Sequence, residues 1–241
     1  MTDYVLSDAT RATLKTCSTA SVATALYKRG LRNQFVQGVV PVAPKREVMV
    51  GQAFTLRYIP AREDRNPITV FRDPNHPQRV AIETCPPGHV LVMDARKDAR
   101  AATAGSILIT RLALRGAAGV VSDGGFRDAD GIGALDMPAY YAKPSAPTNL
   151  THHEAIELNG PIACGDAPVF PGDVMLGDRD GVMVIPAHLA DEIAGECAGM
   201  ESFEDFVMEE VRGGAAIIGL YPATREDVLR KYEAWRERTG R

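Results

Sequence analysis

The sequence lacks the patterns that usually mark membrane, nucleic-acid-binding and zinc-binding proteins. No apolar run approaches the roughly 18 residues of a membrane-spanning helix, so we expect no membrane span. No stretch is rich in lysine or arginine and the formal net charge is −4, which argues against a nucleic-acid partner. The four cysteines are scattered without a Cys-x-x-Cys pair, which excludes the usual zinc spacings and indicates reduced, structural thiols.

The signatures of several common enzyme classes are also missing. The chain has no Gly-x-Gly-x-x-Gly, no Walker phosphate loop and no nucleophile elbow. Because the first residues form no apolar signal core, we expect a cytoplasmic protein. What is present is an ordinary globular composition, 45% hydrophobic and 24% charged over 241 residues. Such a length suffices for one large domain or two small ones.

Apolar periodicity predicts a single α/β domain over 1–241, without repeats or a linker. The segment 59–78 is rich in Pro, Arg and Asp and is predicted to leave the core. Gly51-Gln52, inside the first strand, is a candidate β-bulge. The expected elements are a helix at 10–30, strands at 48–58 and 88–94, a helix at 106–115, a strand at 119–122, a hairpin turning at 177–181, and helices at 187–211 and 224–238.

An arginine and an aspartate stand side by side after the strand at 119–122, where open α/β sheets usually carry their chemistry. Arg127 offers a rigid fork for a carboxylate or enolate, and Asp128 offers oxygen to a hard metal ion. The alternative is an ordinary surface ion pair. Gly124 and Gly125 favour the functional interpretation, since glycine lets backbone and ligand approach closely.

The start of the helix at 106–115 is a candidate anion site, because its first N–H groups point outward unpaired. Its residues are Gly105, Ser106, Ile107 and Leu108. Asp98 lies seven residues before Gly105 and either reaches over this helix start or only caps it.

Histidines and the remaining arginines give weaker signals. His152 and His153 are neighbours, and neighbouring side chains in a helix do not face the same way, which disfavours a shared metal. Arginines near 57–72 and 96–100 either bind a second carboxylate or form ordinary solvated surface, and the second interpretation is favoured.

Two blocks of the chain together resemble the RraA-like family. The first is Gly105 with Gly119-Val120-Val121-x-Asp123-Gly124-Gly125-x-Arg127-Asp128. The second is Pro171-Gly172-Asp173-Val174-x2-Gly177-Asp178-x-Asp180-Gly181-Val182-x-Val184-Ile185-Pro186. The resemblance covers about 14–195 and leaves a C-terminal helical extension at about 196–241. The family includes class II 4-hydroxy-4-methyl-2-oxoglutarate and 4-carboxy-4-hydroxy-2-oxoadipate aldolases and the ribonuclease E inhibitor RraA.

The resemblance implies an α/β fold of the β/β/α swivelling-domain type, assembled as homotrimers or homohexamers with active sites between subunits. It also implies a divalent cation, Mg²⁺ or Mn²⁺. Carried onto matching positions, Arg127 binds the pyruvyl carboxylate or carbonyl, Asp128 holds the metal, and Asp98 orients a catalytic water. The backbone at 106–108 receives the pyruvate carboxylate.

The resemblance thus predicts a metal-dependent lyase that cleaves a 4-hydroxy-2-oxo acid to pyruvate and a second carbonyl compound, with possible oxaloacetate decarboxylation. The alternative is a non-catalytic regulator that binds ribonuclease E. The chain departs from the family pattern at three places. Ala95-Arg96-Lys97 stands where the family has a glycine-rich loop, and Ser106 and Thr24 stand where the family has acids. A metal-binding glutamate is also expected from a neighbouring subunit's C-terminal helix, and the candidates are Glu196, Glu201 and Glu204.

Overall fold

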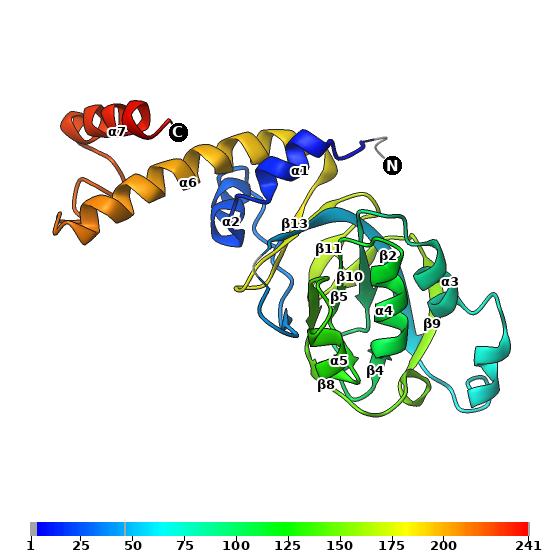
Figure 1. Cartoon of the computed structure of the whole chain (residues 1–241). Coiled ribbons are helices and arrows are strands. Elements are labelled where there is room, and N and C mark those ends of the chain that lie inside the picture. The colour runs from blue at the N-terminus through cyan, green and yellow to red at the C-terminus, as the bar shows by residue number, and fades with distance from the viewer. Residues whose placement is uncertain (1–3, 46, 241) are drawn as a thin grey trace.

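The computed structural model describes residues 4–45 and 47–240 and is a mixed α/β protein with a curled sheet, flanking helices and a projecting C-terminal arm (Figure 1). The strands are β1 (Val40–Pro41), β2 (Met49–Pro60), β3 (His89–Asp94), β4 (Ala102–Ala104), β5 (Gly119–Ser122), β6 (Gly125–Phe126), β7 (Ala139–Tyr141), β8 (Lys143–Pro144), β9 (His153–Leu158), β10 (Ile162–Cys164), β11 (Ala167–Val169), β12 (Val174–Gly177) and β13 (Val182–Ile185). The α-helices are α1 (Asp8–Leu14), α2 (Thr19–Lys28), α3 (Pro77–Thr84), α4 (Ser106–Leu114), α5 (Ala129–Gly133), α6 (Ala190–Arg212) and α7 (Glu226–Thr239), with 3-10 turns η1 (Ile68–Arg72), η2 (Asn149–Thr151) and η3 (Ala187–Leu189).

Strand β2 organises the main sheet, which has eight strands within the described residues. Along the path β1-β7-β5-β3-β2-β12-β13, the pairs from β7 to β2 are parallel and the outer pairs antiparallel. The first part of β2 pairs with β12 and its last part with β9. A long strand that changes partner in this way lets the sheet curl.

The predicted bulge at Gly51-Gln52 is wrong: the register of β2 shifts between Arg57 and Tyr58, opposite β9. Gly51 instead lets neighbouring backbone approach, since a Cβ there would lie 2.6 Å from the carbonyl oxygen of Gly88. The strands at 88–94 and 119–122, the helix at 106–115 and the hairpin at 177–181 are confirmed within a residue or so.

The helices α3, α4 and α5 cover one face of the sheet (Figure 1). Buried Ile109 and Leu112 of α4 and Ile82 of α3 pack against Leu91 of β3 and Val120 of β5. A small parallel sheet, β4-β6-β8, lies beside this layer and carries the chain into α4 and α5. The start of α4 is therefore held by sheet on one side and by helix packing on the other.

The predicted single helix at 10–30 is wrong, because the chain breaks there into α1 and α2. Ser18 ends the continuity: its hydroxyl accepts the N–H of Ser21 at 3.1 Å and caps α2. An N-cap serine competes with helix continuation by offering its own side chain to the backbone.

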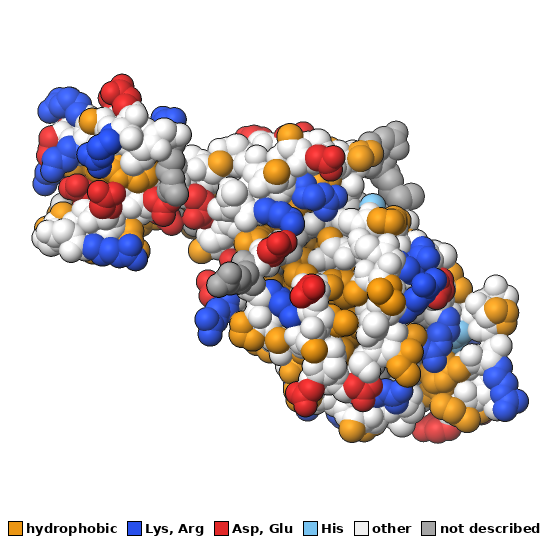
Figure 2. Space-filling model, viewed as in Figure 1, with side chains coloured by type: hydrophobic (Ala, Val, Ile, Leu, Met, Phe, Trp, Pro, Cys, Tyr) orange, Lys and Arg blue, Asp and Glu red, His pale blue; other side chains and the backbone are white. Residues whose placement is uncertain are grey.

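The C-terminal helices form an arm that leaves the body of the molecule. The first turns of α6 pack on α1 and α2, and its far end packs on α7 and the turn between them (Figure 1). Phe203, Phe206, Tyr232 and Trp235 form a separate aromatic cluster there. Figure 2 shows acidic and basic side chains close together on this arm. The predicted boundary at residue 196 lies inside α6. None of the helices in 4–45 and 47–240 is long and apolar enough to cross a membrane.

Candidate functional site

A pocket of about 320 Å³ opens at the N-terminus of α4. Its volume is at the lower end of the range for small-molecule sites, about 300–1,000 Å³. Three regions distant in sequence contribute to it: the end of the excursion with α3, the β4-to-α4 and β6-to-α5 junctions, and the turn η2. The lining residues are Phe71, Gln78, Arg79, Ala102, Ala104, Gly105, Ile107, Leu108, Arg127, Asp128, Thr148 and Asn149.

Gly105, Arg127 and Asp128 lie in direct contact. The backbone N–H of Arg127 donates to the carbonyl of Ala104 at 3.1 Å, which places β6 beside the start of α4. A Cβ on Gly105 would lie 2.8 Å from Nε of Arg127 and 3.0 Å from Oδ2 of Asp128. The absence of a side chain at residue 105 thus leaves room for the side chains of Arg127 and Asp128.

The N-terminus of α4 faces Asp128. Oδ2 of Asp128 accepts the N–H of Ser106 at 3.3 Å and its hydroxyl at 3.2 Å. Among the described residues, the N–H of Ile107 has no hydrogen-bond acceptor and remains available. Unpaired N–H groups and the positive end of the helix dipole favour a bound anion here.

Asp128 is a candidate metal ligand, because one of its carboxylate oxygens is unpaired within the described part of the chain. It caps α5 in the left-handed conformation, with φ of 58°, and 54% of its side chain is exposed. Its Oδ1 accepts no hydrogen bond from the described part of the chain. Those residues also hold no cluster of three or more metal-ligating side chains. Mg²⁺ suits such a site, since it often keeps several waters and binds through one or two carboxylates.

Sequence reasoning missed Arg79, the second arginine of the pocket. Arg79 lies on α3, with its guanidinium 4.3 Å from the ring centre of Phe71. Burial lowers its pKa, and the charge of Arg127 lowers it further. Several arginines considered from sequence form ion pairs elsewhere: Arg57 with Glu157, Arg62 with Asp64 and Arg100 with Asp98. The length of the excursion that carries Phe71 was the available signal, because long irregular loops are often functional.

Asn149 is a second residue that the sequence did not indicate. It is 3% exposed and lines the pocket from η2. Its side-chain nitrogen has no hydrogen-bond partner in the described residues. Because that nitrogen atom is itself fully buried, a ligand in the pocket would reach it only if the turn moved.

Asp98 lies outside the lining of this pocket. Its carboxylate accepts two hydrogen bonds from the guanidinium of Arg100, at 2.9 and 2.7 Å, which hold the pKa of Asp98 well below its usual range. His152 approaches it to 3.9 Å. The structure therefore brings Gly105, Arg127 and Asp128 together but does not add Asp98 to them.

The loop before Asp98 keeps a conformation that glycine would favour. Arg96 and Lys97 have φ of 60° and 57°, so two side chains occupy the left-handed region where the family pattern has glycines. The buried carboxylate of Asp123 fixes the loop by accepting the N–H groups of Ala95 and Lys97, at 2.6 and 3.1 Å. Burial raises the pKa of Asp123 to about 6. Asp123 thus has a structural role in a single chain.

The two histidines do not form a pair of metal ligands. His153 is buried in β9 and its ring lies 5.6 Å from that of Tyr58. Burial lowers the pKa of His153. His152 precedes β9 and is partly exposed beside Asp98.

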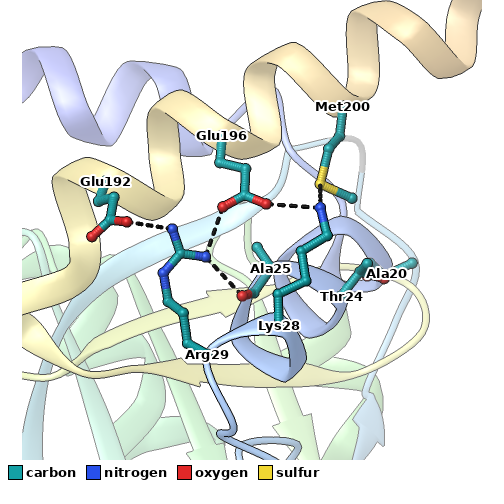
Figure 3. A network of polar contacts seen from close by, with 8 residues as sticks. All are labelled: Ala20, Thr24, Ala25, Lys28, Arg29, Glu192, Glu196 and Met200. Carbon is teal, nitrogen blue, oxygen red and sulfur yellow. Dashed lines mark hydrogen bonds and ion pairs between the residues drawn. The ribbon is translucent and has the colours of Figure 1, made fainter.

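The three candidate glutamates of α6 all have partners within the chain. Glu196 accepts from Lys28 at 2.9 Å and from Arg29 at 2.7 Å and so joins α6 to α2 (Figure 3). Glu201 accepts the N–H of Ser18, and Glu204 accepts the hydroxyl of Tyr221.

Thr24, which stands where the family pattern has an acid, donates to the carbonyl of Ala20 within α2 (Figure 3). It lies in the α2–α6 region, so it does not contribute to the pocket at α4.

Comparison with known proteins finds relatives that match large parts of the chain. A candidate 4-hydroxy-4-methyl-2-oxoglutarate aldolase of Halalkalibacterium halodurans is 37% identical over 110 residues, which cover 44% of this chain and 50% of that protein. Protein DlpA of Legionella pneumophila is 24% identical over 204 residues, covering 83% of this chain and 31% of that protein. The chain therefore spans half or less of the length of these two relatives.

Solved structures share the fold. The crystal structure of Streptomyces coelicolor RraAS2, described as an unusual member of the RNase ES inhibitor RraA family, matches with a TM-score of 0.72 and 26% identity, covering 83% of this chain and 96% of that one. The family model described as "Aldolase/RraA" matches residues 19–184. The chain belongs to the RraA-like family.

Proposed function

We propose that the protein is a divalent-metal-dependent carbon–carbon lyase. It would cleave a 4-hydroxy-2-oxo acid to pyruvate and a second carbonyl compound, and decarboxylate oxaloacetate by the same route. The observation that carries the proposal is the contact of Arg127 and Asp128 across Gly105 at the start of α4. Arg127, the carboxylate of Asp128 and a helix N-terminus then face a single small cavity. The names of relatives, among them the Halalkalibacterium halodurans protein, support an aldolase.

The chain's own groups suit the 2-oxo acid end of such a substrate. The free N–H of Ile107 and the α4 dipole would bind the carboxylate. Arg127, 47% exposed and only 3.9 Å from Asp128 at its nearest, can turn its fork to the oxygen on which enolate charge develops. Charge developing on that oxygen is the feature common to aldol cleavage and to decarboxylation of a 2-oxo acid.

Asp128 would hold the metal through Oδ1, with water and substrate oxygens completing the coordination. When bound, Mg²⁺ or Mn²⁺ would polarise the 2-oxo group and stabilise negative charge on its oxygen. The remaining ligand would come from a neighbouring subunit of a homotrimer or homohexamer. The predicted role of Asp98 in proton transfer stays a prediction, since within one chain its carboxylate pairs with Arg100.

The test is an assay of pyruvate release from racemic 4-hydroxy-4-methyl-2-oxoglutarate and from oxaloacetate, with Mg²⁺ and with EDTA. We expect Arg127→Ala and Asp128→Asn each to lower kcat by about 100-fold or more. The matched controls are Arg111→Ala, on the exposed side of α4, and Asp130→Asn, in the first turn of α5. Turnover that survives chelation and both site substitutions would refute the proposal.

A second candidate is a non-catalytic regulator that binds ribonuclease E. Its support is the likeness to RraAS2 over 83% of this chain. Affinity capture with the catalytic and scaffold regions of ribonuclease E distinguishes the two. Capture by a protein without lyase activity, unchanged by Arg127→Ala, would favour the regulator.

A further inference from the structure

We propose that Cys17 and Cys197 are a site of oxidation, where a disulfide forms and fastens the base of the C-terminal arm to the N-terminal helices. Cys17 lies in the turn between α1 and α2, and Cys197 lies on α6. All four cysteines are free thiols in the structure, so the pair starts reduced. The oxidant would be a low-molecular-weight disulfide. The inference is independent of the lyase reaction, because neither cysteine lines the pocket at α4.

The two thiols meet in the apolar core beneath α6. Their side chains form a hydrogen bond with each other. Cys17 is 1% exposed and Cys197 is fully buried, and both belong to the cluster that joins α1, α2 and α6 to the sheet. A disulfide tolerates only a narrow range of side-chain positions, so two thiols that already touch are the arrangement that it requires.

Contacts without sulfur hold the same two segments together. The N–H of Ser18, the residue after Cys17, donates to Oε1 of Glu201 at 2.8 Å. Glu201 follows Cys197 by four residues on α6, so both side chains lie on the face of the helix that meets the turn. Glu196, the residue before Cys197, joins α6 to the end of α2 (Figure 3). The approach of the two cysteines is therefore part of the packing of α6.

The contact makes the two thiols chemically unequal. The hydrogen bond with Cys197 lowers the pKa of Cys17, whereas the same bond and burial raise the pKa of Cys197. Because the thiolate is the attacking form, Cys17 should react first.

The oxidation is a thiol–disulfide exchange in two steps. The Cys17 thiolate attacks one sulfur of the oxidant, whose S–S bond breaks and releases one thiolate. The Cys197 thiol then loses its proton and attacks the Cys17 sulfur, which releases the second thiolate and forms the protein disulfide. The two protein thiols lose two electrons to the oxidant, and their two protons end on the released thiolates.

Burial of the pair should limit the rate of this exchange. Cys17 lies just below the surface, since Lys15 and Thr16 beside it are exposed. A local opening of the short turn would admit a small oxidant while the sheet stays folded. The equilibrium instead depends on how close the folded state holds the two thiols, and here they are in contact.

The other two cysteines differ from this pair and provide internal controls. Cys85 donates to the carbonyl of Pro86, and Cys164 donates to the carbonyl of Met93. Burial raises the pKa of both thiols, so neither has the activated character of Cys17. Each lies in a different apolar cluster from the pair. Both should remain thiols when Cys17 and Cys197 are oxidised.

The experiment equilibrates the full chain, without denaturant, across a series of ratios of reduced to oxidised glutathione. The samples are quenched with acid, alkylated and mapped by mass spectrometry. We expect a peptide linked through Cys17 and Cys197, with Cys85 and Cys164 alkylated. The disulfide should raise Tm by roughly 5 to 15 °C, because it closes a loop that contains most of the chain.

Variants of the cysteines distinguish this disulfide from other effects of oxidation. Cys17→Ala and Cys197→Ala should each abolish the linked peptide and the rise in Tm, whereas the matched control Cys85→Ala should keep both. Each variant is compared with its own reduced form. A loss of stability caused by the substitution itself therefore does not enter the difference in Tm.

Three results would overturn the inference. The first is a folded wild-type protein in which Cys17 and Cys197 stay reduced at every glutathione ratio. The second is a linkage that forms only at urea concentrations that unfold the chain, because the contact in the folded state would then have no part in it. The third is a linked peptide without a rise in Tm, which would mean that the bond does not fasten the arm.

Discussion

The smallest change that probes the candidate site is Gly105→Ala. A Cβ at residue 105 would lie 2.8 Å from Nε and 2.9 Å from Cγ of Arg127, whereas ordinary contacts are 3.4–4 Å. The Arg127 side chain must therefore move by about 0.6 to 1.2 Å. Since a misplacement of about 1 Å can cost roughly 100-fold in rate, we expect kcat/KM to fall by about 10- to 100-fold.

The substitution should leave stability almost unchanged. Gly105 has φ of −129°, an extended conformation that alanine adopts without strain. Losing glycine at an N-cap costs about 0.5–1 kcal/mol, and restricting the unfolded chain returns about 0.4–1 kcal/mol. The atoms that the Cβ meets belong to mobile side chains rather than to backbone. The effect should consequently appear in activity and not in the free energy of unfolding.

The assay is pyruvate release at saturating Mg²⁺, together with urea unfolding of the same preparations. Gly199→Ala is the matched control, since a Cβ there meets nothing within 4 Å. It should keep wild-type kcat/KM and gain up to about 1 kcal/mol from helix propensity. If Gly105→Ala folds normally and retains wild-type kcat/KM, the contact of Arg127 with Gly105 has no part in the reaction.

Three other predictions concern acids away from the pocket. If Asp98 stays paired with Arg100 in the active protein, Asp98→Asn should change kcat less than tenfold. A loss of about 10²–10⁴ would instead support its predicted role in proton transfer. Burial raises the pKa of Asp123 from 3.8 to about 6, so the folded state keeps this proton to higher pH than the unfolded state. Its stabilising contribution, about 3 kcal/mol, is then present below about pH 4 and lost as pH rises to about 6. The destabilisation by Asp123→Asn in urea unfolding should accordingly shrink by that amount between pH 4 and pH 7, and a constant difference would contradict the assignment. Glu196→Gln should lower the free energy of unfolding by about 1 kcal/mol, because it weakens the ion pairs that join α6 to α2. It should leave the affinity for Mg²⁺ unchanged. Weaker Mg²⁺ binding in a calorimetric titration would instead place Glu196 in a neighbouring subunit's site.

Apolar patterns and glycine spacing in the sequence predicted the part of the candidate site that comes from neighbouring segments of the chain. Gly105, Arg127 and Asp128 fall within 24 residues around one strand–helix–strand unit, whose apolar runs are clear in the sequence. Once β3 and β5 are known to be parallel neighbours, the start of α4 and the chain after β5 must meet at one edge. The contact between the two follows from topology, so a pattern of apolar residues was sufficient to predict it.

The other half depends on packing that no local pattern encodes. Arg79 is one of many arginines, and only the docking of α3 through Gln78 and Tyr58 onto the carbonyl of Thr103 brings it to the pocket. Asn149 arrives from a turn about 70 residues further along the chain. The single helix predicted at 10–30 was wrong for a related reason. Its apolar stripe is continuous, but the hydroxyl of Ser18 competes for a backbone N–H and starts a new helix, and apolar periodicity does not detect such a cap.

The two arginines of the pocket should differ in which kinetic constant they control. In the proposed function Arg127, which lines the pocket, would face the 2-oxo group, where negative charge grows during bond cleavage. Its contribution would then be larger in the transition state than in the ground state. If Arg79, on the same pocket, binds the second carboxylate of 4-hydroxy-4-methyl-2-oxoglutarate, the charge that it contacts does not change during cleavage and its contribution is equal in both states. Arg79→Gln should therefore raise KM for a 2-oxo dicarboxylate about 10- to 100-fold with little change in kcat, whereas Arg127→Ala should lower kcat. If Arg79→Gln lowers kcat and leaves KM unchanged, Arg79 acts on the reacting atoms, and recognition and chemistry are not separated along this pocket.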